Sequence, residues 1–393
     1  MRTSVRTPHP ADTLDRGAPT GLDLHPFLGI RRSRHAFARD HVPAYYVLEQ
    51  RRGPTLLQRG VIGALDLGSA QRAVHPHEQV FADKVATQRT VLRAVGGNPE
   101  PILLACRGTE DVHSVLARIT EGAPDTAVTG PDGSRHLLWR CTDPDRRNVI
   151  AAGLSRHGAL LADGHHRLAA ALEHRRSFGG RPGPWDRLLA LLVDTSRHPL
   201  ELRAIHRRLP GLPAEEAAAR AAAVATVEEV TGVGPPPAPA PGGFVLIGSG
   251  RRWSVRDVCP RRVRAALHGC PDAWVSLDVA VLHYLFIGRV WRIGTGVPGP
   301  AYVHDPAEAT AEDTLVLLAP PREDEIHRLA ADGVLMPQKT TAFGPKPLPW
   351  LVTYHHGHQT RSRPRGEPLP STTPPVRAPL TSVCGETAGH RCY

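Results

Sequence analysis

The sequence is poor in lysine. Of its 48 basic residues only three are Lys, namely Lys84, Lys339 and Lys346, and all three fall in segments with other candidate functional residues. The remaining positive charge comes from Arg residues that are dispersed in pairs. The net charge of +10 is therefore not gathered in one basic helix or tail, which argues against a nucleic-acid partner.

Long apolar runs and closely spaced cysteines are also missing. The first residues lack a signal-peptide core, and no stretch approaches the roughly 18 apolar residues that span a bilayer. The six Cys form no CxxC or other close pair, so neither a zinc site nor a disulfide framework is indicated. We expect a cytoplasmic protein without a membrane partner, and the sequence leaves its oligomeric state open.

Several common enzyme motifs are absent: there is no P-loop GxxxxGK[ST], no GxSxG elbow, no HExxH and no GxGxxG. What is present is a chain of 393 residues with 39 Pro and 37 Gly, long enough for two or three domains with much loop and linker. We predict five parts: a partly disordered N-terminal extension (1–44), a core domain (45–231), a Pro-rich linker (232–243), a second α+β subdomain (244–355) and a disordered tail (356–393).

Local patterns predict several elements. Residues 44–67 alternate as a hairpin that turns at residues 51–53, and residues 81–95 have helical spacing. A helix is expected to begin after Ser276 as its N-cap, and residues 336–347 (MPQKTTAFGPKP) are expected to form a loop.

The segment LADGHHRLAAAL, residues 161–172, predicts a buried strand, a glycine turn and the start of a helix. The first amides of such a helix attract phosphate, and Gly164 allows close approach of a ligand. Arg167 offers a planar fork for phosphate oxygens, while His165 and His166 can donate hydrogen bonds or transfer protons. The alternative is that Asp163 merely caps the helix.

Two other segments contain candidate residues. In HPHEQ, His77 is a candidate substrate ligand, and Glu78 is either a general base or a helix-capping residue. The proline-bounded segment 336–347 presents Lys339, Thr340 and Lys346 to an anion, unless it is only a solvated basic loop.

A second His-Arg pair, His206 and Arg207 in AIHRRL, follows a buried strand and is also a candidate for substrate binding.

A Mg²⁺ ion held by Asp163 together with nucleotide phosphates is more natural than one held by the two adjacent histidines.

The order of these segments carries a resemblance. The turn-helix-strand of residues 75–105, followed later by LLADGHHRLAAAL, resembles the ParB/sulfiredoxin-like fold, and PHE with DGHHR is similar to the free serine kinases of that superfamily. The chain also resembles a large bacterial family of unknown function over residues 22–354. The predicted class is therefore α+β: a ParB/sulfiredoxin-like core with an insertion around residues 109–156, and a second α+β subdomain.

The kinase resemblance implies roles for individual residues. It makes Glu78 the base that activates a substrate hydroxyl, gives Asp163 a part in metal binding or catalysis, and places Gly164, His165 and Arg167 on nucleotide phosphates. His165 joins Glu78 and Asp163 among the catalytic candidates. The segment of Lys339, Thr340 and Lys346 is expected to close over the anionic groups.

The sequence thus predicts a phosphotransferase that uses ATP or ADP with Mg²⁺ and acts on the hydroxyl of a small molecule such as serine. Two alternatives stay open. One is a ParB-like nucleotide-binding regulator or DNA-associated protein, although no helix-turn-helix module follows the core. The other is a metal-dependent hydrolase that uses the two histidines.

Overall fold

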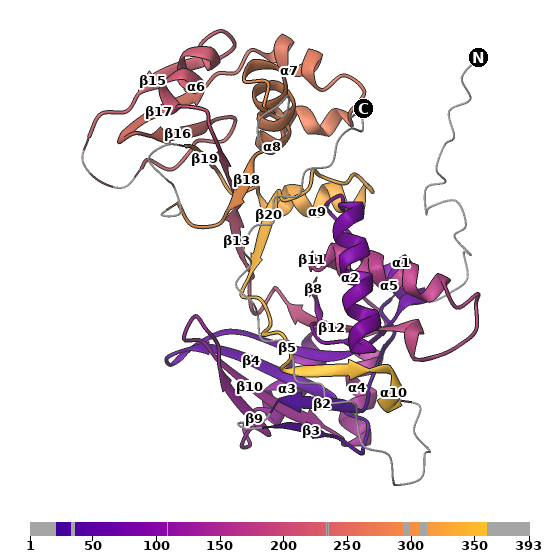
Figure 1. Ribbon diagram of the computed structural model, residues 1–393. Helices are drawn as coiled ribbons and strands as arrows, with labels where there is room; N and C mark the ends of the chain where they lie inside the picture. Colours follow the sequence, from indigo (N-terminus) through magenta and orange to yellow (C-terminus); the bar gives the residue numbers. More distant parts are fainter. Residues whose placement is uncertain are drawn as a thin grey trace, which may run out of the picture. The chain divides into compact units, whose positions relative to one another are not determined.

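The computed structural model describes residues 21–32, 36–107, 109–232, 234, 236–293, 299–306 and 313–359, and all structural statements below concern them. Helices and strands are mixed along this part of the chain, which confirms the predicted α+β class (Figure 1). Most of the predicted disordered start and tail lies outside the described residues. Within that tail, however, α10 (His356–Gln359) is helical. No helix in the described part is both long and apolar enough to cross a membrane.

The largest sheet has nine strands in the order β6-β11-β8-β12-β5-β4-β10-β9, with β1 paired to β5. The predicted hairpin is confirmed by the antiparallel pair β4 and β5. The pairs β11–β6 and β12–β8 are parallel. The strands are β1 (Leu24–His25), β4 (Tyr45–Arg52), β5 (Thr55–Asp66), β6 (Val74–His75), β8 (Ile102–Cys106), β9 (Thr126–Thr129), β10 (Arg135–Cys141), β11 (Ala159–Asp163) and β12 (Arg187–Asp194).

The nine-stranded sheet is buried on both faces, as β12 shows most clearly. Its sequence RLLALLVD has no polar alternation, because every second side chain contributes to a different hydrophobic core. Leu189 and Leu191 pack into one core, whereas Leu188 and Leu192 pack into the other. A continuous apolar run is what a strand covered on both sides requires.

Helices cover this sheet and position the candidate site. The predicted helix is confirmed as α2 (Ala82–Val95), which packs beside α5 (His165–Arg176) and is tied to it by a 3.1 Å ion pair between Arg89 and Glu173. The sequence around residues 109–156 adds β9 and β10 to the sheet edge. The other helical elements here are α1 (Leu67–Ala73), α3 (Glu110–Ile119), α4 (Pro144–Leu154) and the short 3-10 turn η2 (Pro184–Asp186).

A second sheet has six strands in the order β15-β17-β16-β19-β14-β18. Its strands are β14 (His206–Leu209), β15 (Thr226–Glu229), β16 (Phe244–Gly248), β17 (Arg251–Arg256), β18 (Ala301–Val303) and β19 (Thr314–Leu318). Strands β14 and β15 precede the Pro-rich segment 232–243, and β16 follows it. The segment predicted as a linker between two domains therefore connects two strands of one sheet. The division into domains stays a proposal.

The helices of residues 214–331 differ from expectation at one end. They are α6 (Ala214–Ala221), α7 (Pro260–Ala266), η3 (Asp272–Ser276), α8 (Asp278–Val281), the π-helix η4 (Leu282–Val290) and α9 (Glu323–Ala331). Ser276 is not the N-cap that the sequence suggests. Leu277 occupies that position, while the hydroxyl of Ser276 donates to the carbonyl of Ala273 at 2.9 Å.

Two small sheets bring the end of the described chain back to its beginning. Strand β20 (Thr341–Gly344), which lies in the segment predicted as a loop, pairs with β13 (Glu201–Ala204). Strand β21 (Val352–His355) pairs with β2 (Gly29–Arg32) and β7 (Gly97–Asn98), and β3 (Phe37–Arg39) pairs with β2. The segment 336–347 is therefore held through β20, and the pairing of β21 holds the chain that follows it.

Candidate functional site

The predicted strand-turn-helix is confirmed at residues 159–176. Strand β11 ends at Asp163, Gly164 adopts a left-handed conformation with φ of 101°, and α5 begins at His165. A Cβ atom at Gly164 would lie 2.7 Å from Cγ2 of Ile102, so both the backbone angle and the available space require glycine. The tight turn leaves the first amides of α5, which have no partner within the helix, at the carboxyl end of β11.

Asp163 does not cap α5, because the N-cap residue is Gly164 and no side chain caps this end. The Asp163 carboxylate instead binds two cations: Oδ2 pairs with Arg167, and Oδ1 lies 2.7 Å from Nζ of Lys346. Arg167 also pairs with Glu100 at 2.9 Å. Burial would raise the pKa of Asp163, but Arg167 and Lys346 outweigh it and lower that pKa. Asp163 therefore stays ionised at neutral pH.

Glu78 is bound to the segment around Lys339. Its Oε1 accepts hydrogen bonds from the amide of Thr341 at 2.6 Å and from its hydroxyl at 2.7 Å, and its Oε2 accepts from the amide of Lys339 at 3.1 Å. The adjoining backbone pairs as well, since the amide of Gln79 donates to the carbonyl of Met336. Burial raises the pKa of Glu78, and these hydrogen bonds oppose the rise without cancelling it.

The backbone of Lys339 is held from both sides. Its amide donates to Glu78, and its carbonyl accepts a 2.8 Å hydrogen bond from Nη2 of Arg207. Lys339 has φ of 57°, a left-handed conformation that is costly for a residue with a Cβ. Arg207 is fully buried, and its Nε donates to Nε2 of His283 at 2.8 Å. These contacts hold the strained residue and direct its side chain to the site.

The backbone of Lys346 is anchored in a similar way by the hairpin of β4 and β5. Buried Gln50 donates to the carbonyl of Lys346 at 3.1 Å, and buried Gln58 donates to the carbonyl of Pro345 at 2.9 Å. Buried amides that hold a backbone this way are typical of a segment whose position matters.

The histidines act mainly as connectors. Nε2 of His165 accepts from the amide of His77 at 3.3 Å, and Nε2 of His166 accepts from the amide of Phe81 at 3.0 Å. Burial lowers the pKa of both rings, that of His165 to well below its usual value. Because neutral rings that accept through Nε2 carry their proton on Nδ1, each can still donate one hydrogen bond. This arrangement does not favour His165 as a proton carrier at neutral pH.

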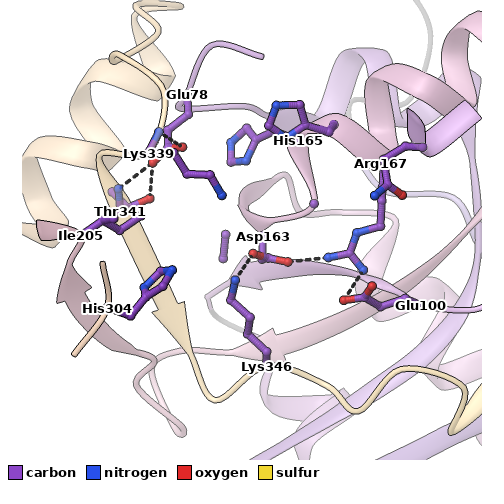
Figure 2. Close-up of a pocket in the computed structure, with 14 residues that line it drawn as sticks. Glu78, Glu100, Asp163, His165, Arg167, Ile205, His304, Lys339, Thr341 and Lys346 are labelled. Carbon is purple, nitrogen blue, oxygen red and sulfur yellow. Dashed lines mark hydrogen bonds and ion pairs between the residues drawn. The ribbon is translucent and has the colours of Figure 1, made fainter. Parts of the chain in front are cut away.

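Most of the predicted residues surround one cavity of about 200 Å³. Figure 2 shows Lys339, Lys346 and Arg167 around the same space, with Asp163 between the last two. Arg167 and Lys346 are ion-paired, whereas no carboxylate of the described residues forms an ion pair with Lys339. The lining residues are Glu78, Gln88, Glu100, Ala162, Asp163, Gly164, His165, His166, Arg167, Ile205, His304, Lys339, Thr341 and Lys346.

Several predicted contacts are not part of this lining. Thr340 is buried and donates to the carbonyl of Pro337 at 2.6 Å, so the lining threonine is its neighbour Thr341. Fully buried His77 contacts the hydroxyl of Thr341 at 2.7 Å, and burial lowers its pKa to about 4. Nδ1 of His206 accepts from the amide of Leu318 at 3.2 Å. With Arg207, these residues support the site and do not line it.

Besides Ala162 and Thr341, four lining residues were not predicted from the sequence: Gln88, Glu100, Ile205 and His304. Glu100 lies in the segment PEPILLAC, residues 99–106, which the sequence predicts as a buried strand, and a charged residue there is the only local signal among the four. The others reach the cavity from α2, from the residue between β13 and β14, and from the residue after β18. Only tertiary folding brings these three elements together.

The donor set does not fit a resident divalent metal ion. No group of three His, Cys, Asp or Glu residues in the described part of the chain is arranged to hold one. Each oxygen of Asp163 already faces a cation. The expectation that Asp163 binds Mg²⁺ is therefore not supported, and we derive no step through a metal.

The fold and the site define an α+β protein whose cavity, at a strand-to-helix turn, is lined by the cationic side chains of Arg167, Lys339 and Lys346. The chain belongs to the family described as "Protein of unknown function (DUF1015)", whose model matches residues 31–280. This match confirms the predicted relation to a family of unknown function. No curated protein matches the sequence.

Three solved structures illustrate what the chain is similar to. A mutant free serine kinase in complex with AMP shares 15% identity at a TM-score of 0.36, over 72% of this chain and 87% of that one. A conserved hypothetical protein from Pyrococcus furiosus shares 15% identity at a TM-score of 0.35, over 74% and 92%. SbnI with C-terminal truncation from Staphylococcus aureus shares 10% identity at 0.39, over 74% and 87%. Likeness at this level carries no argument about activity, and the ParB/sulfiredoxin-like description of the core stays a prediction.

Proposed function

We propose that this protein is a nucleotide-dependent phosphotransferase that acts on the hydroxyl of a small molecule. The observation that supports it best is that one cavity contains both an anion-binding side and a buried carboxylate. The anion side comprises Lys339 and the first turn of α5, and the carboxylate is Glu78. Phosphoryl transfer needs mainly positioning and charge stabilisation, together with a base for the attacking hydroxyl.

The anion side combines several kinds of donor. Lys339 contributes an ammonium group without an ion-pair partner among the described residues, and the amides at the start of α5 contribute the positive end of a helix dipole. Lys346 and Arg167 are already neutralised in part by Asp163 and Glu100. An entering phosphate can therefore bind Lys339 and the amides first, and draw on Lys346 and Arg167 by exchange with the carboxylates.

Glu78 is suited to accept a proton. Its Oε1 already accepts two hydrogen bonds, whereas Oε2 accepts one and keeps a free acceptor position. The partial burial that raises the pKa of Glu78 also increases its basicity toward a bound hydroxyl. The side chain is 11% exposed, so it can reach a ligand in the cavity.

In the proposed reaction, a hydroxyl of the acceptor attacks the terminal phosphate of the nucleotide. The acceptor oxygen forms a bond to the terminal phosphorus of the nucleotide, and its proton passes to Glu78. The bond between that phosphorus and the bridging oxygen breaks, and the electron pair leaves with the shortened nucleotide. Lys339 and the amides of α5 stabilise the charge on the transferred group and on the leaving oxygen.

The test is turnover of the full chain with ATP or ADP and a panel of hydroxy compounds, followed by phosphorus NMR. Glu78→Gln should lose at least about a hundredfold in turnover while ADP binding, measured by calorimetry, persists. The matched control is Glu173→Gln, which removes a carboxylate of α5 that does not line the cavity. Turnover of Glu78→Gln equal to that of the control removes Glu78 from the mechanism.

A nucleotide-binding regulator is a second candidate, favoured by one specific observation. Both oxygens of Glu78 are engaged by the segment around Lys339, so Glu78 can serve as a latch on that segment without any chemistry. The two candidates differ in the same assay, because a regulator binds nucleotide and yields no phosphorylated product.

A further inference from the structure

A second and larger cavity adjoins the candidate site. It has a volume of about 750 Å³ and shares two lining residues with the smaller one, His304 and Lys346. Strand β20 runs from one to the other, because Thr341 lines the smaller cavity and Ala342 to Gly344 line the larger one. The two cavities are therefore neighbouring compartments on either side of Lys346.

The walls of the larger cavity are mostly apolar and rigid. Leu57, Phe343, Leu348 and three prolines, Pro345, Pro347 and Pro349, lie along it. Proline fixes its backbone angle φ, so this wall has little freedom to collapse or rearrange. A volume between about 300 and 1,000 Å³ with predominantly apolar walls is typical of sites for organic ligands of moderate size.

The charged groups at this cavity are already paired. Arg203 forms a 2.7 Å ion pair with Glu201, and Arg52 lies 3.7 Å from the carboxylate of Asp132. Among the described Lys, Arg, Asp and Glu residues, Lys346 alone lines both compartments, and it pairs with Asp163. The walls thus favour a ligand body without net charge.

One residue of the larger compartment lies on the same side of the smaller cavity as the proposed base. In Figure 2, Glu78, Thr341 and His304 lie on the side of β20, whereas Arg167 and Glu100 lie across the cavity from them. His304 is one of the two residues common to both compartments. A molecule whose hydroxyl meets Glu78 can therefore extend past His304 into the larger compartment.

We infer that the larger compartment holds the body of the phosphoryl acceptor, and that the acceptor is an alcohol with an uncharged, apolar body bulkier than a free amino acid. This inference rests on the proposed function. It departs from the small acceptor that the sequence suggests, since free serine leaves most of the larger compartment unfilled.

The test compares two probes in the presence of ADP by calorimetry on the full chain. L-Serine is the small probe, and N-benzoyl-L-serine amide keeps the hydroxyl and adds an uncharged aromatic body. The second probe should bind about tenfold more tightly or better, because its ring is buried against the apolar wall. Leu57→Arg, which places a charge in the larger compartment, should abolish that advantage and leave ADP affinity unchanged. Leu56→Arg, one position away and outside the lining, is the matched control.

Equal affinity for the two probes, or an advantage that survives Leu57→Arg, would overturn the inference. A loss of ADP affinity in Leu57→Arg would also overturn it, because the compartment would then hold the nucleoside. Failure of the proposed function has a different signature: the bulky probe binds with the expected preference, which supports the compartment, but no probe is phosphorylated.

Discussion

Arg207 donates a hydrogen bond of 2.8 Å to the main-chain carbonyl of Lys339, 132 residues further along the chain. The Arg207 guanidinium is fully buried and pairs with no carboxylate of the described residues; burial lowers its pKa to about 10. Removing such a charge from water is costly, and its contacts are with carbonyls, a neutral histidine ring and the face of Tyr302. We therefore infer that the buried Arg207 serves to fix the position of Lys339.

Arg207 is therefore predicted to be a positioning residue that acts through Lys339. Arg207→Lys keeps a cation but cannot bridge the Lys339 carbonyl and His283 together, and ADP affinity should fall about tenfold. The same substitution should have almost no further effect when Lys339 is already replaced by Ala, as a double-mutant cycle measured by calorimetry would show. Arg208→Lys is the matched control, because Arg208 forms its ion pair with Asp313, at 3.2 Å.

Additive losses in that cycle would contradict the prediction. They would mean that Arg207 affects binding by a route that does not involve Lys339, such as a general loosening of the six-stranded sheet.

Gly164→Ala is predicted to destabilise the fold by about 2 to 4 kcal/mol, because the φ of 101° and the contact with Ile102 both oppose a Cβ. Gly179→Ala is the control, since Gly179 also has positive φ, 60°, but no atom would lie within 4 Å of its Cβ. The free energy of unfolding in urea should fall by clearly more in Gly164→Ala than in Gly179→Ala. Equal losses would show that backbone strain alone sets the cost and that the turn has room for a side chain.

Asp163→Asn distinguishes a charge-balancing role from a metal-binding one. Because Asp163 neutralises Lys346 and shares Arg167 with Glu100, its loss should free Lys346, leave Arg167 paired only with Glu100, and tighten ADP binding roughly threefold, with or without Mg²⁺. Asp186→Asn, which disturbs a 3.0 Å ion pair with Arg175 outside the cavity, should leave ADP binding unchanged. Weaker binding that occurs only when Mg²⁺ is present would restore the metal role that the sequence suggested.

The elements of the fold that local sequence determines were predicted well. The helix of residues 82–95 shows helical spacing, and the turn after Asp163 contains the glycine that its geometry requires. The strand β20 was missed because residues 341–344 lie between prolines and pair with β13, about 140 residues earlier in the chain. Likewise, nothing local shows that β14 belongs with β16 to β19.

In the site, too, local sequence predicted some residues, whereas tertiary contacts determine the others. Residues next to one another in DGHHR were found together, because a single turn presents them. The choice between Thr340 and Thr341 depends on which of two successive side chains faces the cavity, and only the pairing of the segment with Glu78 decides it. His304 and Ile205 carried no signal, since each is a single residue at the end of a distant strand.

The central claim is that Glu78 and the anion side of the cavity act together in phosphoryl transfer. The most direct measurement is phosphorus NMR of the full chain with ATP, Mg²⁺ and N-benzoyl-L-serine amide, in parallel for the unaltered protein and Glu78→Gln. The account predicts a new phosphomonoester signal with the unaltered protein, and loss of that signal in Glu78→Gln while ADP still binds. Absence of the phosphomonoester from the unaltered protein, or its undiminished formation by Glu78→Gln, would contradict the account.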